Sequence, residues 1–140
     1  MKRLIVLLLF PLVVFASAMN FEQKIYAAIL QDIFPHQSTI AVWSDDKEIR
    51  NLLQTIVHVR VVASPKDANF LIIKYDKEIK GVKGYIFAAS YRILKYYKDE
   101  AIGGFFWQKG RPNVIFLAPN LKKKSLQLPK DLEQYIENEL

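Results

Sequence analysis

The chain has 140 residues, 51% hydrophobic and 24% charged, so it is long and apolar enough to bury one hydrophobic core. It contains no cysteine, which excludes disulfide bonds and leaves the core to stabilise the fold. The formal net charge of +6 is a modest excess that suits an anionic partner or a membrane surface.

The N-terminus has the pattern of a secretory signal peptide. Residues 2–3 are basic, residues 4–15 are apolar, and residues 16–18 form a small-residue cleavage site. The apolar run contains Pro11 and is shorter than the roughly 20 residues that span a bilayer. We therefore expect cleavage after Ala18; a retained membrane anchor is the alternative.

The mature chain is then a single domain of residues 19–140. Removal of the two basic leader residues lowers its net charge to +4. Export places this domain in the periplasm and argues against nucleic acid as a partner.

Apolar residues at helical spacing follow the leader. Asn20 can cap a helix and Pro35 ends it, which predicts a helix over residues 21–34. The predicted buried stripe consists of Phe21, Ile25, Ala28, Ile29 and Ile33.

The next segment has the pattern of a strand that leads directly into a helix. Residues 39–43 are β-branched and aromatic, and Ser44 is placed to cap the helix that follows. Asp45 and Asp46 then fall in its acidic first turn. This is the first half of a β-α-β unit, and Ile49, Leu52 and Leu53 form the apolar face of its helix.

Three further strands are predicted before the C-terminal third. Residues 57–62 alternate apolar and polar side chains, as in a strand that lies at an edge or has one face exposed to solvent. A turn at residues 64–67 separates them from a continuous buried strand over residues 69–75. Residues 85–88 form another buried strand, and Ser90 caps a helix over residues 91–97.

The C-terminal third begins with a predicted β-hairpin. Two apolar runs, residues 102–107 and 114–118, flank a turn at residues 108–112. Pro112 lacks an amide hydrogen, so the second strand is expected to begin at Asn113 or later. The continuous apolar sequence of the second run predicts that it is covered on both faces. Gly103-Gly104 allows close approach of another backbone.

The chain closes with helical signals. Asn120 can cap a basic turn over residues 121–124, and Pro129 occupies the first position of a helix over residues 129–139. Strands that alternate with helices, followed by a hairpin and a closing helix, predict an α/β fold with a mostly parallel sheet flanked by helices.

Catalytic and metal-binding patterns are weak. Residues 81–84 lack the spacing of a phosphate-binding loop, and with two histidines, His36 and His58, a zinc site would need carboxylates from distant elements. Asp45 and Asp46 fit either a metal or acid–base pair, as in an exported hydrolase, or compensation of a helix dipole. We expect no catalytic set, no metal and no cofactor.

A ligand site is expected where parallel strands end, because open sheets bind ligands at the carboxyl ends of their strands. This region would hold a small anion or another small molecule at Ser44, Asp45, Lys74, Ser90 and Arg92.

A protein interface is the other expectation. The hairpin tip carries aromatic and basic residues, as does the helix over residues 91–97, and such side chains are typical of interfaces. The residues predicted to bind a partner are Trp107, Lys109, Arg111, Tyr91, Tyr96 and Tyr97. An ordinary core hairpin with a solvated tip is the alternative. Lys122, Lys123 and Lys124 form either a solvated helix face or a contact with anionic lipid headgroups.

The order of these parts resembles the YfiR-like periplasmic proteins. The resemblance lies in a leader and amphipathic helix like residues 24–34, a strand and Asp-containing turn like residues 40–46, and a buried strand like residues 70–74. It continues with a Gly-rich hairpin, an Asn-containing step and a final helix, as at Ile102 to Phe106, Val114 to Asn120 and Leu126 to Ile136.

That resemblance implies a small exported α/β regulator that contacts a membrane-bound signalling partner, such as a sensor kinase or a cyclase, and it implies no catalytic residue. The chain departs from the pattern in three places. It lacks the redox-responsive cysteines, it lacks the tryptophan that often precedes the aromatic-Pro step at Phe34-Pro35, and its segment from Trp107 to Pro112 has no counterpart.

Overall fold

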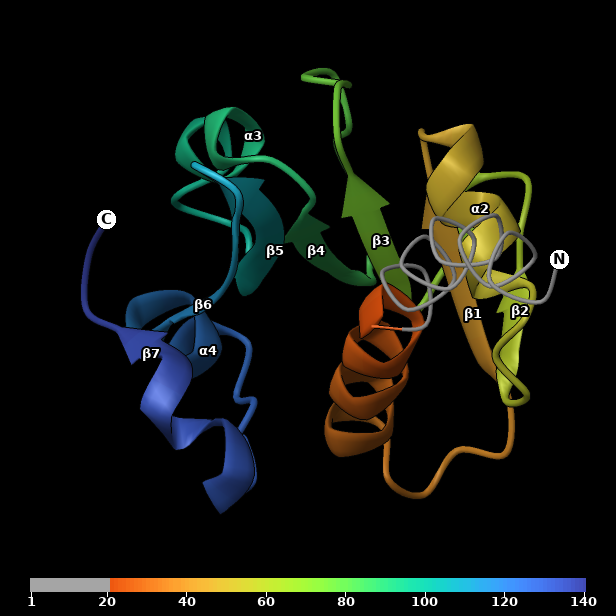
Figure 1. The fold of residues 1–140 in the computed structure, drawn as a ribbon, viewed down its shortest axis with the longest axis horizontal. Helices are drawn as coiled ribbons and strands as arrows, with labels where there is room; N and C mark the ends of the chain where they lie inside the picture. Colours follow the sequence, from red (N-terminus) through yellow and green to blue (C-terminus); the bar gives the residue numbers. More distant parts are fainter. Residues whose placement is uncertain (1–20) are drawn as a thin grey trace, which may run out of the picture.

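The computed structural model describes residues 21–140, so the expected signal peptide lies outside the described residues. The described chain forms a seven-stranded sheet in the order β2-β1-β3-β4-β5-β6-β7. β2, β1, β3, β4 and β5 pair in parallel, β6 is antiparallel to β5, and β7 is parallel to β6. Figure 1 shows β2 and β7 at the two ends of the row, with the N-terminal helix (orange) drawn in front of the strands. The predicted α/β fold with a mostly parallel sheet is confirmed.

The strands are β1 (Ile40–Ser44), β2 (Val59–Val61), β3 (Phe70–Ile73), β4 (Tyr85–Ala88), β5 (Gly103–Gln108), β6 (Arg111–Leu117) and β7 (Ile136–Glu137). The helices are the N-terminal helix (residues 21–33), α2 (Lys47–Leu53), α3 (Tyr91–Tyr96) and α4 (Ala118–Lys123). Two 3-10 helices, η1 (Pro65–Asp67) and η2 (Lys130–Tyr135), complete the described chain.

Both faces of the sheet are covered, because side chains alternate along each strand. In β3, Phe70 and Ile72 face a cluster that includes the N-terminal helix and α2. Leu71 and Ile73 face a second cluster that includes α3. The two-sided burial predicted for β6 is confirmed as well, since Phe116 joins the first cluster and Leu117 the second.

The buried stripe of the N-terminal helix differs from the predicted one. Ile29 and Ile33 are buried as expected, but Phe21 and Ala28 are exposed. Tyr26 and Leu30 take their places in the core. Positions 26, 29, 30 and 33 are separated by three, one and three residues, which places their side chains on one face of the helix.

The helix after β1 begins two residues later than expected, so the prediction that Ser44 is its N-cap was wrong. Asp46 is its N-cap, and its carboxylate accepts the amide hydrogen of Ile49 at 3.0 Å. Ser44 accepts from the Asp46 amide at 3.2 Å and so stabilises the turn before the helix. The predicted cap of α3 is confirmed, because the Ser90 hydroxyl accepts from the amide of Ile93 at 3.1 Å.

The hairpin has a tighter turn than expected. β5 runs to Gln108 and β6 begins at Arg111, so only Lys109 and Gly110 connect them, both with positive φ (54° and 74°). The expectation that the second strand begins at Asn113 or later was wrong, since Pro112 pairs with Trp107. β7 pairs with β6 only at Phe116 and Leu117, so the outer edge at Pro112 is open and needs no amide donor.

The predicted close approach at the double glycine is confirmed. A Cβ atom on Gly103 would collide with the Ile115 carbonyl, and one on Gly104 would lie 2.9 Å from the Ala88 carbonyl oxygen. The close approach of β6 at Gly103 and of β4 at Gly104 therefore requires glycine at both positions.

Two predictions for the C-terminus were wrong. Asn120 does not cap a helix: α4 begins at Ala118, and the buried Asn120 amide donates to the carbonyl oxygens of Lys98 and Ala101 at 2.6 and 2.7 Å. The closing helix is the 3-10 helix η2, preceded by Pro129, and it ends where Ile136 enters β7. Pairing with the open edge of β6 competes successfully with helix extension.

Candidate functional site: a groove between two helices

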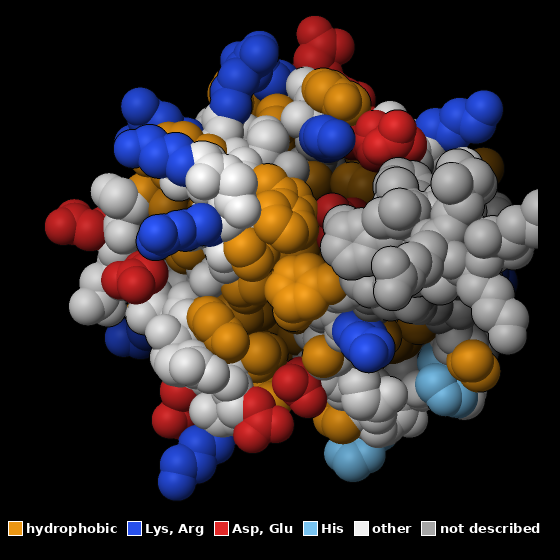
Figure 2. All heavy atoms as spheres, in the orientation of Figure 1, with side chains coloured by type: hydrophobic (Ala, Val, Ile, Leu, Met, Phe, Trp, Pro, Cys, Tyr) orange, Lys and Arg blue, Asp and Glu red, His pale blue; other side chains and the backbone are white. Residues whose placement is uncertain are grey.

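A large hollow lies between the N-terminal helix, α2 and the end of β5. Its volume is about 790 Å³. Its lining residues come from the N-terminal helix, α2 and β5 and from the segments that follow β1, α2, β3 and β4: Glu22, Gln23, Tyr26, Asp46, Glu48, Ile49, Asn51, Leu52, Thr55, Lys74, Ala89, Phe105, Phe106 and Trp107. Figure 2 shows hydrophobic side chains gathered at the centre of this face of the molecule.

The strand order places the groove at the carboxyl ends of the parallel strands. The chain runs outward from β1 to β2 and then crosses back to β3, so the β1–β3 boundary is the topological switch point. The sequence predicted a ligand site at this edge, and the hollow does lie along it. The groove extends from there towards β5 and the N-terminal helix, which the prediction did not include.

Asp45 lies at this switch point, where its carboxylate binds the backbone of the segment after β3. Its two carboxylate oxygens accept the amide hydrogens of Lys74, Tyr75 and Asp76 at 2.7–2.8 Å. These bonds end β3 at Ile73, two residues earlier than predicted, and turn the chain away from the sheet. Asp45 therefore has a structural role, and its predicted role as a ligand-binding residue stays a prediction.

The other predicted ligand residues do not form a common site. Ser44 is buried, and the Ser90 hydroxyl caps α3 and donates to the Lys74 carbonyl oxygen at 3.4 Å. Arg92 is exposed and lines neither hollow of the described chain. Lys74 does line the groove, with its ammonium group 5.6 Å from the ring centre of Tyr75.

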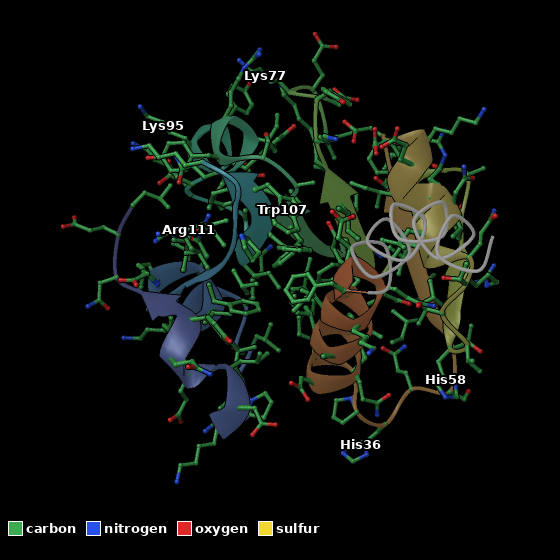
Figure 3. All side chains as sticks on the ribbon, viewed as in Figure 1. His36, His58, Lys77, Lys95, Trp107 and Arg111 are labelled. Atoms are coloured by element: carbon green, nitrogen blue, oxygen red, sulfur yellow. The ribbon has the colours of Figure 1, made fainter. Side chains whose placement is uncertain are left out.

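The wall near the hairpin joins β5 to the N-terminal helix. Trp107 Nε1 donates to Glu22 Oε1 at 2.8 Å, and the Trp107 ring lies 6.1 Å from the ring of Phe21. Trp107 is 47% exposed, and Figure 3 shows it near the centre of the face. The prediction that Trp107 is accessible to a partner is thus compatible with its position, although the indole is fixed against a helix and not free at the hairpin tip.

The floor of the groove is aromatic. Phe105 lies edge-on to Tyr26 with ring centres 5.3 Å apart, and both residues are buried. On the opposite wall Gln23 Nε2 donates to Thr55 Oγ1 at 2.8 Å, which ties the N-terminal helix to the segment after α2. Contacts at both sides therefore fix the position of this helix over the sheet.

The charges around the groove are mainly negative. Glu22, Asp46 and Glu48 contribute three carboxylates, and Lys74 contributes one ammonium group. Burial, and then the negative charges of Glu22 and Asp46, raise the pKa of the Tyr26 hydroxyl well above its usual value. The hydroxyl stays protonated and the lining is unfavourable for an anion, although the chain as a whole is basic.

The predicted interface residues are divided between two sides of the molecule. Lys109 and Arg111 are exposed at the hairpin tip and do not line the groove. Tyr91 lies 5.8 Å from Phe106, a residue of the cluster on the α3 side that also lines the groove, whereas Phe105 belongs to the opposite cluster. Tyr96 is exposed on α3 with the Lys77 ammonium 5.2 Å from its ring centre.

Tyr97 was wrongly predicted to contact a partner. It is 5% exposed, its hydroxyl donates to the Asp76 carbonyl oxygen at 2.7 Å, and it accepts from the Ile79 amide at 3.2 Å. Burial raises the pKa of this hydroxyl. Tyr97 thereby fixes the long connection between β3 and β4.

The basic run near the C-terminus is exposed. Lys122, Lys123 and Lys124 lie in or just after the last turn of α4, and Lys123 Nζ donates to the Asp99 carbonyl oxygen at 3.4 Å. Lys123 also borders a smaller hollow of about 460 Å³, together with Lys95, Lys98 and the C-terminal Leu140. A contact of this run with lipid headgroups stays a prediction.

Sequence reasoning missed Glu22, Tyr26 and Phe105. Glu22 and Tyr26 are one turn apart and lie on the helix face that carries Ile29 and Ile33. Extending the predicted buried stripe towards the start of the helix would therefore have placed both residues on the face that packs against the sheet. Their contact with β5 depends on tertiary packing across about eighty residues, which no local pattern reveals.

Within residues 21–140, no group of three or more acidic or histidine side chains is arranged to hold a metal ion. His36 and His58 are exposed at the end of the molecule away from Trp107 (Figure 3). In the same part of the chain, no helix combines the length and apolar character needed to cross a bilayer. A comparison with protein-family models and one with curated proteins found no match to this chain.

Proposed function

We propose that this chain is an exported binding protein, without catalysis of its own, that regulates a membrane-bound signalling protein such as a sensor kinase or a cyclase. The groove between the N-terminal helix and α2 carries this proposal. It combines an aromatic floor, a half-exposed tryptophan and a polar rim in a hollow of about 790 Å³, which are features of surfaces that bind proteins.

The chemistry of the lining supports binding over turnover. The described lining residues include neither histidine nor cysteine, and the Asp46 carboxylate already caps a helix. A small-anion site, the alternative expected from the sequence, receives little support, because three carboxylates surround the groove and the predicted anion ligands do not converge.

The order of elements supports the regulatory part of the proposal. The resemblance to the YfiR-like proteins includes the amphipathic helix, the Asp-containing turn after β1 and the Gly-rich hairpin, beside a buried strand, an Asn-containing step and a final helix. In the structure the first three of these segments meet: the helix and the hairpin strand form the walls of the groove, and the turn borders its floor. Part of the resemblance therefore lies at the surface that we propose for binding.

Capture from solubilised membranes tests this function. Wild-type protein is compared with Asn51→Trp, which fills the groove with a large side chain, and with Lys80→Trp, at an exposed residue outside the groove lining. We expect wild type and Lys80→Trp to retain one membrane protein with a kinase or cyclase domain, and Asn51→Trp to lose it. Addition of wild type must then change the turnover of that enzyme; unchanged turnover, or capture that survives Asn51→Trp, contradicts the proposal.

Export has its own test. The full chain is produced in a Gram-negative host and the mass of the accumulated protein is measured. We expect a mature protein that begins at Met19. A protein that keeps residues 1–18 contradicts cleavage and points to a retained anchor.

A further inference from the structure

We propose that a basic surface formed by α3 and α4 binds anionic lipid headgroups and holds the protein at a membrane surface. This α3–α4 surface consists of Tyr91, Arg92, Lys95, Lys98 and the lysines at 122–124, all of which are exposed. The inference goes beyond the proposed function, because it concerns a second surface, and a lipid instead of a partner protein. None of these residues lines the groove.

The first observation is where the net charge of the protein lies. Residues 91–100 and 118–124 contain six basic and two acidic residues, which gives them a net charge of +4. The chain from residue 21 onwards also has a net charge of +4, because residues 2 and 3 contribute two of the 20 basic residues. The remainder of the described chain is therefore neutral overall, and the positive charge belongs to these two short segments.

The second observation is that hydrogen bonds join the two segments into one surface. The Asn120 amide of α4 donates to the carbonyl oxygens of Lys98 and Ala101, which follow α3, at 2.6 and 2.7 Å. Lys123 Nζ donates to the carbonyl oxygen of Asp99 at 3.4 Å. Residues 19–24 positions apart in the sequence therefore present their side chains together.

A hollow of about 460 Å³ lies between α3 and α4. Tyr91 and Lys95 line it from α3, and Lys123 lines it from α4. Tyr91 is 40% exposed, and its ring has an apolar body and a polar tip, which suits the boundary between headgroups and acyl chains. Asp99 and Glu139 also border the hollow, but the exposed basic residues of the α3–α4 surface outnumber them.

The kind of basic residue favours lipid over an acidic protein. Five of the six cations are lysines, whose ammonium groups are point charges on flexible stems. Such groups adapt to a fluid layer of headgroups, whereas arginine is the preferred residue for paired hydrogen bonds to carboxylates in fixed positions. Clusters of about four to eight basic residues are typical of surfaces that bind anionic lipids.

The position of the α3–α4 surface leaves the groove accessible. Figure 1 shows α3 and α4 beside β5 and β6, whereas the N-terminal helix and α2 lie towards β3 and β1. Figure 2 shows Lys and Arg side chains (blue) gathered at the upper left, where Figure 1 places α3. In Figure 3, Lys95 lies at the edge of the molecule and points away from Trp107. A protein held through this surface can therefore bind a partner in its groove at the same time.

Sedimentation with lipid vesicles tests the proposal. The protein that accumulates in the producing host is mixed with vesicles that contain about one third phosphatidylglycerol in phosphatidylcholine, an anionic surface, or with pure phosphatidylcholine. An apolar leader, if retained, binds both kinds of vesicle alike. The ratio of the two partition coefficients therefore isolates the contribution of charge.

We expect the wild-type protein to prefer anionic vesicles by at least about tenfold, because one lysine near an anionic surface changes binding roughly fivefold. Salt at about 1 M, which screens charges beyond roughly 3 Å, should abolish the preference. The combined variant Lys95→Glu, Lys98→Glu and Lys123→Glu should lose it as well.

A matched control separates local charge from net charge. The combined variant Lys24→Glu, Lys66→Glu and Lys83→Glu changes the net charge by the same amount at three exposed lysines outside the α3–α4 surface. We expect this control to keep most of the preference for anionic vesicles. An equal loss of preference in both combined variants overturns the proposal, because it shows that net charge alone is responsible.

The lack of cysteine in the chain allows a second, local measurement. An environment-sensitive fluorophore is attached to a single introduced cysteine, in either Lys122→Cys or Lys66→Cys. We expect anionic vesicles to shift the emission of the label at position 122 and to leave that at position 66 unchanged. Equal shifts at the two positions contradict binding through the α3–α4 surface.

Failure of this proposal is distinguishable from failure of the proposed function. Equal partition of wild type into both kinds of vesicle overturns the lipid surface, and the regulatory function still stands if Asn51→Trp abolishes capture of the membrane partner. If wild type also ignores anionic vesicles but the variant at positions 95, 98 and 123 loses capture from solubilised membranes, an acidic protein occupies the α3–α4 surface and the lipid proposal is wrong.

Discussion

Trp107 Nε1 donates a hydrogen bond to Glu22 Oε1 at 2.8 Å, joining residues 85 positions apart in the sequence. The bond ties the first turn of the N-terminal helix to the last residues of β5. Because both residues also line the groove, the same contact stabilises the fold and shapes the candidate binding surface.

Removal of the hydrogen bond between Trp107 and Glu22 should lower the free energy of unfolding by a moderate amount. Trp107→Phe keeps an aromatic ring and loses the donor, so we expect a loss of about 1 kcal/mol in the free energy of unfolding. Glu22→Gln keeps an acceptor oxygen and should cost less than half of that. Urea denaturation measures both, and equal losses would contradict the importance of the shared hydrogen bond.

Asp45 should matter far more to stability than its neighbour. In Asp45→Asn, an amide group replaces one oxygen and faces backbone donors of residues 74–76. We expect a loss of about 2–3 kcal/mol, since hydrogen bonds to charged groups are the stronger ones. Asp46→Asn is the matched control, because asparagine caps helices as well as aspartate does. Similar denaturation midpoints for the two variants would refute the bridging role of Asp45.

The connection between β3 and β4 should depend on Tyr97. Tyr97→Phe leaves the Ile79 amide and the Asp76 carbonyl without their hydroxyl partner, at a cost of about 1–3 kcal/mol. Tyr96→Phe, on the exposed side of the same helix, should change stability by less than about 0.5 kcal/mol. Hydrogen exchange of the Ile79 amide gives a local readout, and unchanged protection in Tyr97→Phe would count against this contact.

Tyr26 should make the protein sensitive to alkaline pH. Its pKa is raised in the folded state, while in the unfolded chain it titrates near 10.0. Above pH 10 the folded state therefore holds more protons than the unfolded state, and stability falls as the pH rises. Below pH 10 this contribution is fully present.

Tyr26→Phe tests that dependence. The variant should show a shallower loss of unfolding free energy between pH 9 and pH 11 than wild type, because it removes the group that must stay protonated. Tyr75→Phe, whose ring is exposed, is the control and should follow the wild-type slope. A wild-type slope in Tyr26→Phe would show that this hydroxyl is not responsible.

Much of the fold was predictable because its signals are local. β4 matches the predicted strand over residues 85–88, Ser90 caps α3 as expected, and the alternating segment before residue 62 is the edge strand β2. Each of these depends on side-chain periodicity or on a cap within a few residues, so neighbouring sequence is enough to identify it.

The errors arise where pairing partners decide the structure. Pro112 joins β6 because the outer edge of that strand is open at this point, and Ile136 leaves the predicted helix because the edge of β6 is available. Asn120 bonds two carbonyl groups after α3 instead of capping its own helix. None of these outcomes follows from the local sequence.

The groove was predictable only in part. The hollow lies at the carboxyl ends of the strands, where parallel topology predicts a ligand site. Its character was not predictable, because Asp45 bonds with residues about thirty positions away and Glu22 meets Trp107 from the other end of the chain. The predicted basic and aromatic patch is divided by the sheet, whose two faces the sequence alone did not assign.

The most direct test of groove-mediated regulation is photo-crosslinking in living cells. A photoreactive amino acid is placed at Asn51, an exposed residue that lines the groove, or at Lys80, which lies outside it. We expect the Asn51 probe to capture one membrane protein with a signalling domain, the Lys80 probe to capture none, and Trp107→Ala to abolish capture from Asn51. Equal capture from both positions, or no membrane protein from Asn51, would contradict the groove as the regulatory surface.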